Sequence, residues 1–184
     1  MNILIINQPP FNRGDESAHK GLIRTLLKRF PSAKIKVMHE AWLSESYRQY
    51  DVHDERVKYI SEARGVMKFS RFFNHDVYTN HTWLWCWHPI YRWLEQTYKW
   101  ADIVVCAPGG ICMGGFQDWN HLYHLRLAQL FKRPLAYYGR SFGPFPTETE
   151  RNRQFKKISL DMLHYFGYLS IRDHKTELLA DELN

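Results

Sequence analysis

The stretch NILIIN, residues 2–7, is a short and nearly continuous apolar run, which is typical of a strand buried on both faces of a parallel sheet. After a loop with two prolines, apolar residues recur at helical spacing from Ala18 to Phe30, and Pro31 ends that helix. The segment AKIKVM, residues 33–38, then predicts a second strand. Together these elements form a β-α-β unit, which folds with a right-handed crossover.

The same alternation continues through the rest of the chain. Four further apolar runs have the length and composition of strands: residues 57–60, 103–107, 134–139 and 168–171. Helical patterns lie between the last three, and a final short helix is expected from about Lys175. Strands that alternate with helices predict an α/β, Rossmann-like parallel sheet with helices on both faces. We expect residues 1–184 to form one such domain.

The composition is that of a globular chain and excludes several classes of protein. Of the 184 residues 45% are hydrophobic and 24% are charged, and the net charge is +6. No window reaches the ~18 apolar residues of a membrane span, and the basic residues form no nucleic-acid-binding motif. The N-terminus lacks the features of a signal peptide, so a cytoplasmic location is expected. The three cysteines have no metal-binding spacing, and neither a metal nor a cofactor is predicted.

Unusual loops follow several of the predicted strands. In open α/β sheets, ligands bind at the carboxyl ends of the strands. Four polar or glycine-rich segments fall at those ends: NRGDE at 12–16, GGICMGG at 109–115, RSFGP at 140–144, and Arg172-Asp173. Their location on one edge of the sheet predicts a ligand site there.

The first two loops suggest different chemistry. Asp15 and Glu16 start a helix, where carboxylates satisfy free backbone N–H groups; the alternative is that they bind sugar hydroxyls, since they would repel a phosphate. The segment from Gly109 to Gly115 has four glycines and no acidic residue, so its backbone N–H groups can approach an anion; the alternative is a tight turn. It matches neither the GxGxxG fingerprint nor a Walker A loop.

The arginines and histidines near this edge also have alternative roles. Arg172 either grips a carboxylate or phosphate through its bidentate fork or pairs with Asp173, and both interpretations stand. For Arg140 the structural interpretation is favoured. His121 and His124 are three residues apart on a predicted helix, but no third ligand is evident, so no metal site is predicted.

Taken together, these segments resemble the motifs of the polysaccharide pyruvyltransferase family. The matching segments occur in the family's order: Asn12, Gly14, Asp15 and Glu16; Ala101–Val105 with Gly109 and Gly110; Arg133-Pro134 with Ser141–Pro144; and Ser170–Asp173. Two positions depart from the pattern. Ile111 replaces the usual third glycine, which weakens the case for close backbone approach, and Arg140 stands where the family often has Gln.

The resemblance implies a fold and a reaction. The fold resembles one half of a two-domain GT-B-type glycosyltransferase, with the active site in a cleft between two Rossmann-like halves. The reaction transfers the pyruvyl group of phosphoenolpyruvate to a glycan or lipid-linked sugar acceptor of a cell-surface or exopolysaccharide. The family's second half is absent from the 184 residues, so we expect this chain to supply one side of the cleft and to show no turnover alone.

The resemblance also implies substrate-binding residues: Asn12, Gly14, Asp15, Gly109, Gly110, Ser141, Gly143 and Arg172. Arg172 is the candidate for phosphoenolpyruvate, and Asp15, Gly109, Gly110 and Ser141 would line the acceptor side. The catalytic acid and base, the acceptor sugar and the oligomeric state, a homo-oligomer included, stay open. Two other functions also stay open: a non-catalytic module that binds a sugar or nucleotide sugar, and one half of a glycosyltransferase.

Overall fold

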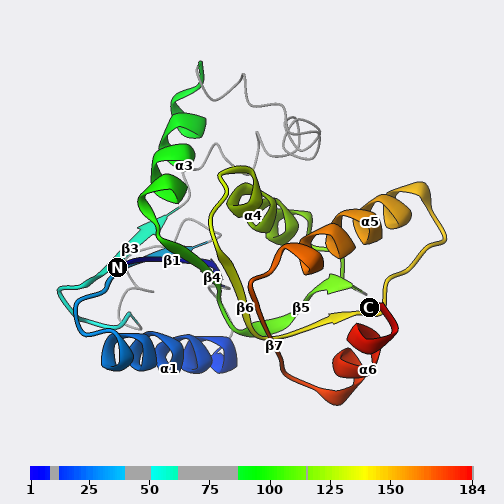
Figure 1. Cartoon of the computed structure of the whole chain (residues 1–184), viewed down its shortest axis with the longest axis horizontal. Coiled ribbons are helices and arrows are strands. Elements are labelled where there is room, and N and C mark those ends of the chain that lie inside the picture. The colour runs from blue at the N-terminus through cyan, green and yellow to red at the C-terminus, as the bar shows by residue number, and fades with distance from the viewer. Residues whose placement is uncertain (9–12, 40–50, 62–86, 115, 184) are drawn as a thin grey trace.

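The computed structural model describes residues 1–8, 13–39, 51–61, 87–114 and 116–183. In these ranges, seven strands and five helices form an α/β Rossmann-like arrangement (Figure 1). The strands are β1 Asn2–Gln8, β2 Lys34–His39, β3 Val57–Ser61, β4 Ile103–Cys106, β5 Gly109–Gly114, β6 Leu135–Gly143 and β7 Tyr168–Ile171. The helices are α1 Arg13–Arg29, α3 Pro89–Trp100, α4 Trp119–Leu130, α5 Glu150–Tyr165 and α6 His174–Leu183.

All the strand pairs in the sheet are parallel, and the order begins β3-β2-β1-β4-β6. Strand β6 has a partner on each edge. Ala136 pairs with both β4 and β7, and Arg140 pairs with both β5 and β7, so β4 and β5 follow one another along the same edge of β6. The chain moves outward from β1 to β3 and then returns to the other side of β1 as β4. The order of the strands therefore reverses between β1 and β4, which makes this the topological switch point of the sheet.

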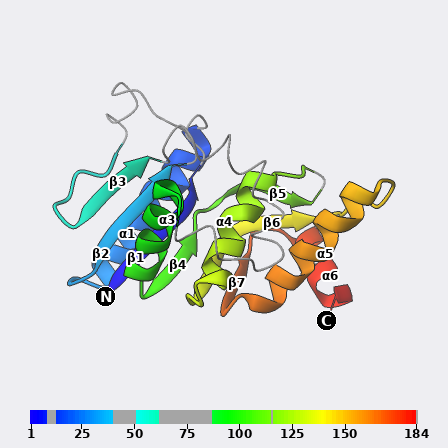
Figure 2. The same ribbon diagram turned by 90° about the horizontal axis from the view of Figure 1, so that it is seen from above.

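Helices cover both faces of the sheet, as the sequence predicts. Ile3 and Ile5 of β1 pack in the same cluster as the buried leucines and isoleucine of α1. Leu4 and Ile6 point to the opposite face and pack in a cluster with α3, α4 and α5. Figure 2 shows these three helices side by side over that face. This alternation explains why β1 is apolar on both faces.

Two segments that the sequence predicts as loops are strands. Gly109–Gly114 forms β5, and β6 continues through Gly143 instead of ending at Gly139. These segments lack an apolar alternation because three of the six residues of β5 are glycines, and because the end of β6 buries the polar residues Arg140 and Ser141. A Cβ on Gly114 would overlap the backbone of Gly143, so the absence of side chains lets the two strands approach.

The helices of the described ranges are at most 17 residues long. Among these helices, none is both long enough and apolar enough to cross a bilayer.

Candidate functional site

Gly109 lies at the centre of the candidate site, directly after β4 at the topological switch point. A Cβ on this residue would lie 2.9 Å from Nη2 of Arg140 and 3.4 Å from Oδ1 of Asp15. In addition, Nη1 of Arg172 donates a hydrogen bond to the carbonyl oxygen of Gly109 at 3.4 Å. The structure therefore brings together three residues that the sequence predicts for substrate binding, Asp15, Gly109 and Arg172.

Different elements position these three residues. Asp15 is half-buried in the first turn of α1, which begins at Arg13 just after the segment that follows β1. Gly109 is buried at the start of β5, and Arg172 is exposed immediately after β7. Because parallel strands present their carboxyl ends at one edge, residues more than 150 positions apart in the sequence meet here.

Arg140 is the register partner of Gly109 on the neighbouring strand β6, and it is fully buried. Its Nε donates to the carbonyl oxygen of Ala107 at 2.5 Å, and its Nη2 donates to that of Asn7 at 2.7 Å. The guanidinium thus ties the end of β1 to the end of β4, across the switch point. This geometry supports the structural interpretation of Arg140.

His121 of α4 is a further buried residue that contacts the Arg140 guanidinium. Its Nδ1 lies 3.3 Å from Nη1 of Arg140. Because a guanidinium only donates, Nδ1 must accept, and the ring carries its proton on Nε2. Burial, followed by the positive charge of Arg140, holds the pKa of His121 well below its usual value, so the ring is neutral. Among the described residues, no group of histidine, cysteine, aspartate or glutamate has an arrangement that could hold a metal.

Asn7 is a site residue that lies outside the sequence motifs. It has a positive φ of 59°, a conformation that asparagine tolerates better than most residues. Its Nδ2 donates to the carbonyl oxygen of His121 at 3.1 Å, while its own carbonyl accepts from Arg140. The sequence feature that could have identified Asn7 is the pair of polar residues, Asn7 and Gln8, directly after the apolar run of β1.

Two other predicted residues, Ser141 and Gly143, lie further along β6. Ser141 is 3% exposed, and its hydroxyl donates to Oδ2 of Asp173. Gly143 has a φ of 72°, and a Cβ there would overlap the side chain of Leu179 in α6. Both residues thus contact α6 or the residue that precedes it, and their predicted contact with substrate stays a prediction.

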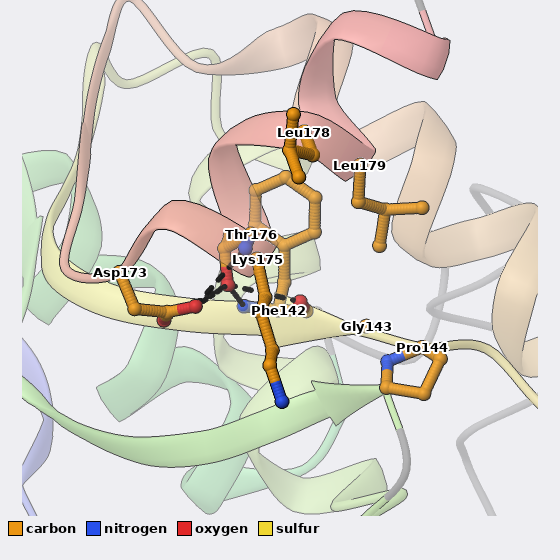
Figure 3. Close-up of a pocket in the computed structure, with 8 residues that line it drawn as sticks. All are labelled: Phe142, Gly143, Pro144, Asp173, Lys175, Thr176, Leu178 and Leu179. Atoms are coloured by element: carbon orange, nitrogen blue, oxygen red, sulfur yellow. Dashed lines mark hydrogen bonds between the residues drawn. The ribbon is translucent and has the colours of Figure 1, made fainter.

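A pocket of about 360 Å³ lies where α6 meets the end of β6 (Figure 3). Apolar residues form most of its lining, and Asp173, Lys175 and Thr176 are its polar members. Figure 3 shows Asp173, Thr176 and Phe142 joined by hydrogen bonds at its wall. The pocket is therefore next to the Arg172-Asp173 segment.

The remaining predicted residues have simpler outcomes. Gly14 is exposed in the first turn of α1, and Gly110 follows Gly109 in β5. Asn12 lies outside the described residues.

Other residues of the sequence motifs hold the sheet together. Oδ2 of Asp102, before β4, accepts a hydrogen bond of 2.8 Å from the backbone N–H of Asn2. Arg133, before β6, donates to the carbonyl oxygen of Ala101 at 3.3 Å. These contacts join the starts of neighbouring strands, at the opposite edge from the candidate site. The motifs therefore combine residues of the site with residues that set the positions of strands.

The fold and the site define an α/β protein of the Rossmann type with a candidate ligand site at the carboxyl ends of its strands. The family model described as polysaccharide pyruvyl transferase matches residues 12–183, which is most of the chain. The chain belongs to this family. A comparison with curated proteins gives no match.

Proposed function

We propose that the chain takes part in transferring the pyruvyl group of phosphoenolpyruvate to a sugar of a cell-surface or exopolysaccharide. One observation carries this proposal: Arg172 and Asp15 converge on Gly109 at the topological switch point. Family membership supports the reaction class, and the chemistry of these side chains supports the assignment of substrates to them.

Arg172 is the proposed ligand of phosphoenolpyruvate. A guanidinium has five N–H donors, and among the described residues the carbonyl oxygen of Gly109 is its hydrogen-bond acceptor. The other donors suit the carboxylate or the phosphate of the substrate, which an arginine binds bidentately. Because Gly109 has no side chain, the substrate can approach the backbone beside this guanidinium.

Asp15 is proposed to face the acceptor sugar. Its carboxylate would repel a phosphate but accepts hydrogen bonds from sugar hydroxyls. In the transfer, one hydroxyl oxygen bonds to C2 of phosphoenolpyruvate while C3 takes a proton and becomes a methyl group. A second hydroxyl oxygen then displaces the phosphate, which leaves with one of the two hydroxyl protons while the other balances the proton taken by C3, and a pyruvate ketal remains on the sugar. The cationic Arg172 would stabilise the departing phosphate.

In the proposed arrangement, this edge is one side of a cleft, as in one half of a two-domain GT-B-type enzyme. A second Rossmann-like body would face it, and the reaction would take place in the cytoplasm. The position of the candidate site at the carboxyl ends of the strands supports this arrangement.

Calorimetric titration with phosphoenolpyruvate tests the proposal. We expect Arg172→Ala to weaken binding about 10- to 100-fold, as expected for the loss of a charge-assisted contact. Arg153→Ala is the matched control, because Arg153 is an exposed arginine on α5 that pairs with Glu150. Binding of a nucleotide sugar in place of phosphoenolpyruvate would instead indicate a glycosyltransferase half. Binding of a glycan alone would indicate a non-catalytic module, and either result would overturn the proposal.

A further inference from the structure

We propose that Asp173 is a positioning residue for Arg172, and that Ser141 acts on the substrate only through Asp173. This inference rests on the proposed function, in which Arg172 binds phosphoenolpyruvate. It assigns Ser141 a role different from direct contact with the acceptor.

Both carboxylate oxygens of Asp173 accept hydrogen bonds. Oδ1 accepts from the backbone N–H of Thr176 at 3.0 Å, and Oδ2 accepts from the hydroxyl of Ser141. The hydroxyl of Thr176 lies within 3.1 Å of both oxygens. The hydrogen bond from Ser141, followed by that from the Thr176 backbone, lowers the pKa of Asp173, so the carboxylate is ionised at neutral pH.

These contacts join two elements. Ser141 belongs to β6, whereas Thr176 lies in the first turn of α6. Thr176 adds a second link, because its Oγ1 accepts from the N–H of Phe142 at 3.4 Å and lies 3.3 Å from the Phe142 carbonyl oxygen (Figure 3). The backbone at Asp173 is thus fixed against the strand that carries Arg140 and Ser141.

Arg172 is therefore anchored at both ends. Its backbone is one peptide unit, about 3.8 Å between Cα atoms, from Asp173. Its guanidinium contacts the carbonyl oxygen of Gly109. A long side chain that is held in this way loses less conformational freedom when it binds an anion. The two motifs, Ser141–Pro144 and Arg172-Asp173, thus act as one unit.

A helix cap alone does not account for this arrangement. Capping α6 needs only the bond from the Thr176 N–H to Asp173. The Ser141 bond is additional, and it comes from a different element. Asp173 and Thr176 also line the adjoining pocket of about 360 Å³, so these hydrogen bonds lie at its wall.

The test compares Ser141→Ala, Asp173→Asn and Arg172→Ala by calorimetric titration with phosphoenolpyruvate. The first two substitutions should each weaken binding about 5- to 10-fold, less than Arg172→Ala does. The decisive variant combines Ser141→Ala with Arg172→Ala. If Ser141 acts only through Arg172, the double variant binds no more weakly than Arg172→Ala alone. Additive losses would show that Ser141 contacts the substrate directly and would overturn the inference.

Further measurements separate this role from a purely structural one. Thr176→Val should weaken binding, and Thr176→Ser, which keeps the hydroxyl, should restore it. Asp161→Asn is the matched control, because Asp161 is a carboxylate on α5 that pairs with Arg126. A lower Tm with unchanged affinity in Ser141→Ala and Asp173→Asn would show that Asp173 only stabilises the fold. Unchanged affinity in Arg172→Ala would instead refute the proposed function.

Discussion

The buried histidine His19 makes stability depend on pH in a way that can be measured. It lies on α1 and is 4% exposed. Burial, followed by the charges of His39 and Lys20, lowers its pKa from 6.5 to about 3. The ring is therefore neutral in the folded protein at all pH values above about 3.

The direction of this pH dependence follows from the number of protons that each state binds. Between about pH 6.5 and about pH 3, the unfolded chain binds a proton at His19 and the folded chain does not. The contribution of His19 to the free energy of unfolding is therefore fully present above pH 6.5, and it decreases as the pH falls through this window. For a shift of this size, the free energy of unfolding falls by about 2 kcal/mol from pH 8 to pH 5. The carboxylates of Asp54 and Asp173 have lowered pKa values, so their contributions are lost only at lower pH.

Urea unfolding followed by circular dichroism at pH 8, 7, 6 and 5 measures this effect. His121 also has a lowered pKa and contributes in the same window, so the informative quantity is the difference between the wild type and His19→Leu. We expect the loss of stability from pH 8 to pH 5 to be about 2 kcal/mol smaller in His19→Leu. His53→Leu, at an exposed position, is the control for the loss of a histidine. If the free energy of unfolding depended on pH to the same extent in the wild type and in His19→Leu, the reasoning would be refuted.

Three further substitutions test the local geometry by urea unfolding. Gly143→Ala should destabilise the fold by about 2–4 kcal/mol, because φ is 72° and the new Cβ overlaps Leu179. A wild-type midpoint for this variant would contradict the described backbone. Gly109→Ala should cost less, about 1–2 kcal/mol, because Gly109 has no positive φ and the new Cβ meets only the Arg140 guanidinium closely, at 2.9 Å; it should also weaken phosphoenolpyruvate binding. Asp118→Ala should cost about 1 kcal/mol, since Asp118 caps α4 through the N–H groups of its first turn; no change would show that solvent replaces the cap.

The regular elements were predictable because their patterns are local. The apolar run of β1 and the helical spacing of α1 each report burial directly, and both lie where the sequence predicts them. Strand β5 was missed because three of its six residues are glycines, which give no pattern of alternating apolar and polar side chains; its pairing with β6 is what defines it as a strand. Such a strand is defined by its neighbour, which a single sequence does not show.

The candidate site was predictable in location more than in detail. The rule on strand ends brings Asp15, Gly109 and Arg172 to one edge, and the structure places them there. The same rule does not tell whether a polar side chain points toward a ligand or toward the protein. Ser141 bonds to Asp173, and this contact depends on where α6 packs.

The pairing of β4 with β6 has a consequence for how the sheet opens. Val104–Cys106 pairs with Leu135–Tyr137, and this short ladder joins the β3-β2-β1-β4 half of the sheet to the β5-β6-β7 half. Beyond it, Arg140 supplies side-chain hydrogen bonds to the ends of β1 and β4. We therefore expect native-state hydrogen exchange to show two cooperative units that separate at this junction. A substitution at Arg140 would speed exchange in the second unit while the amides of β1 and β2 stay protected.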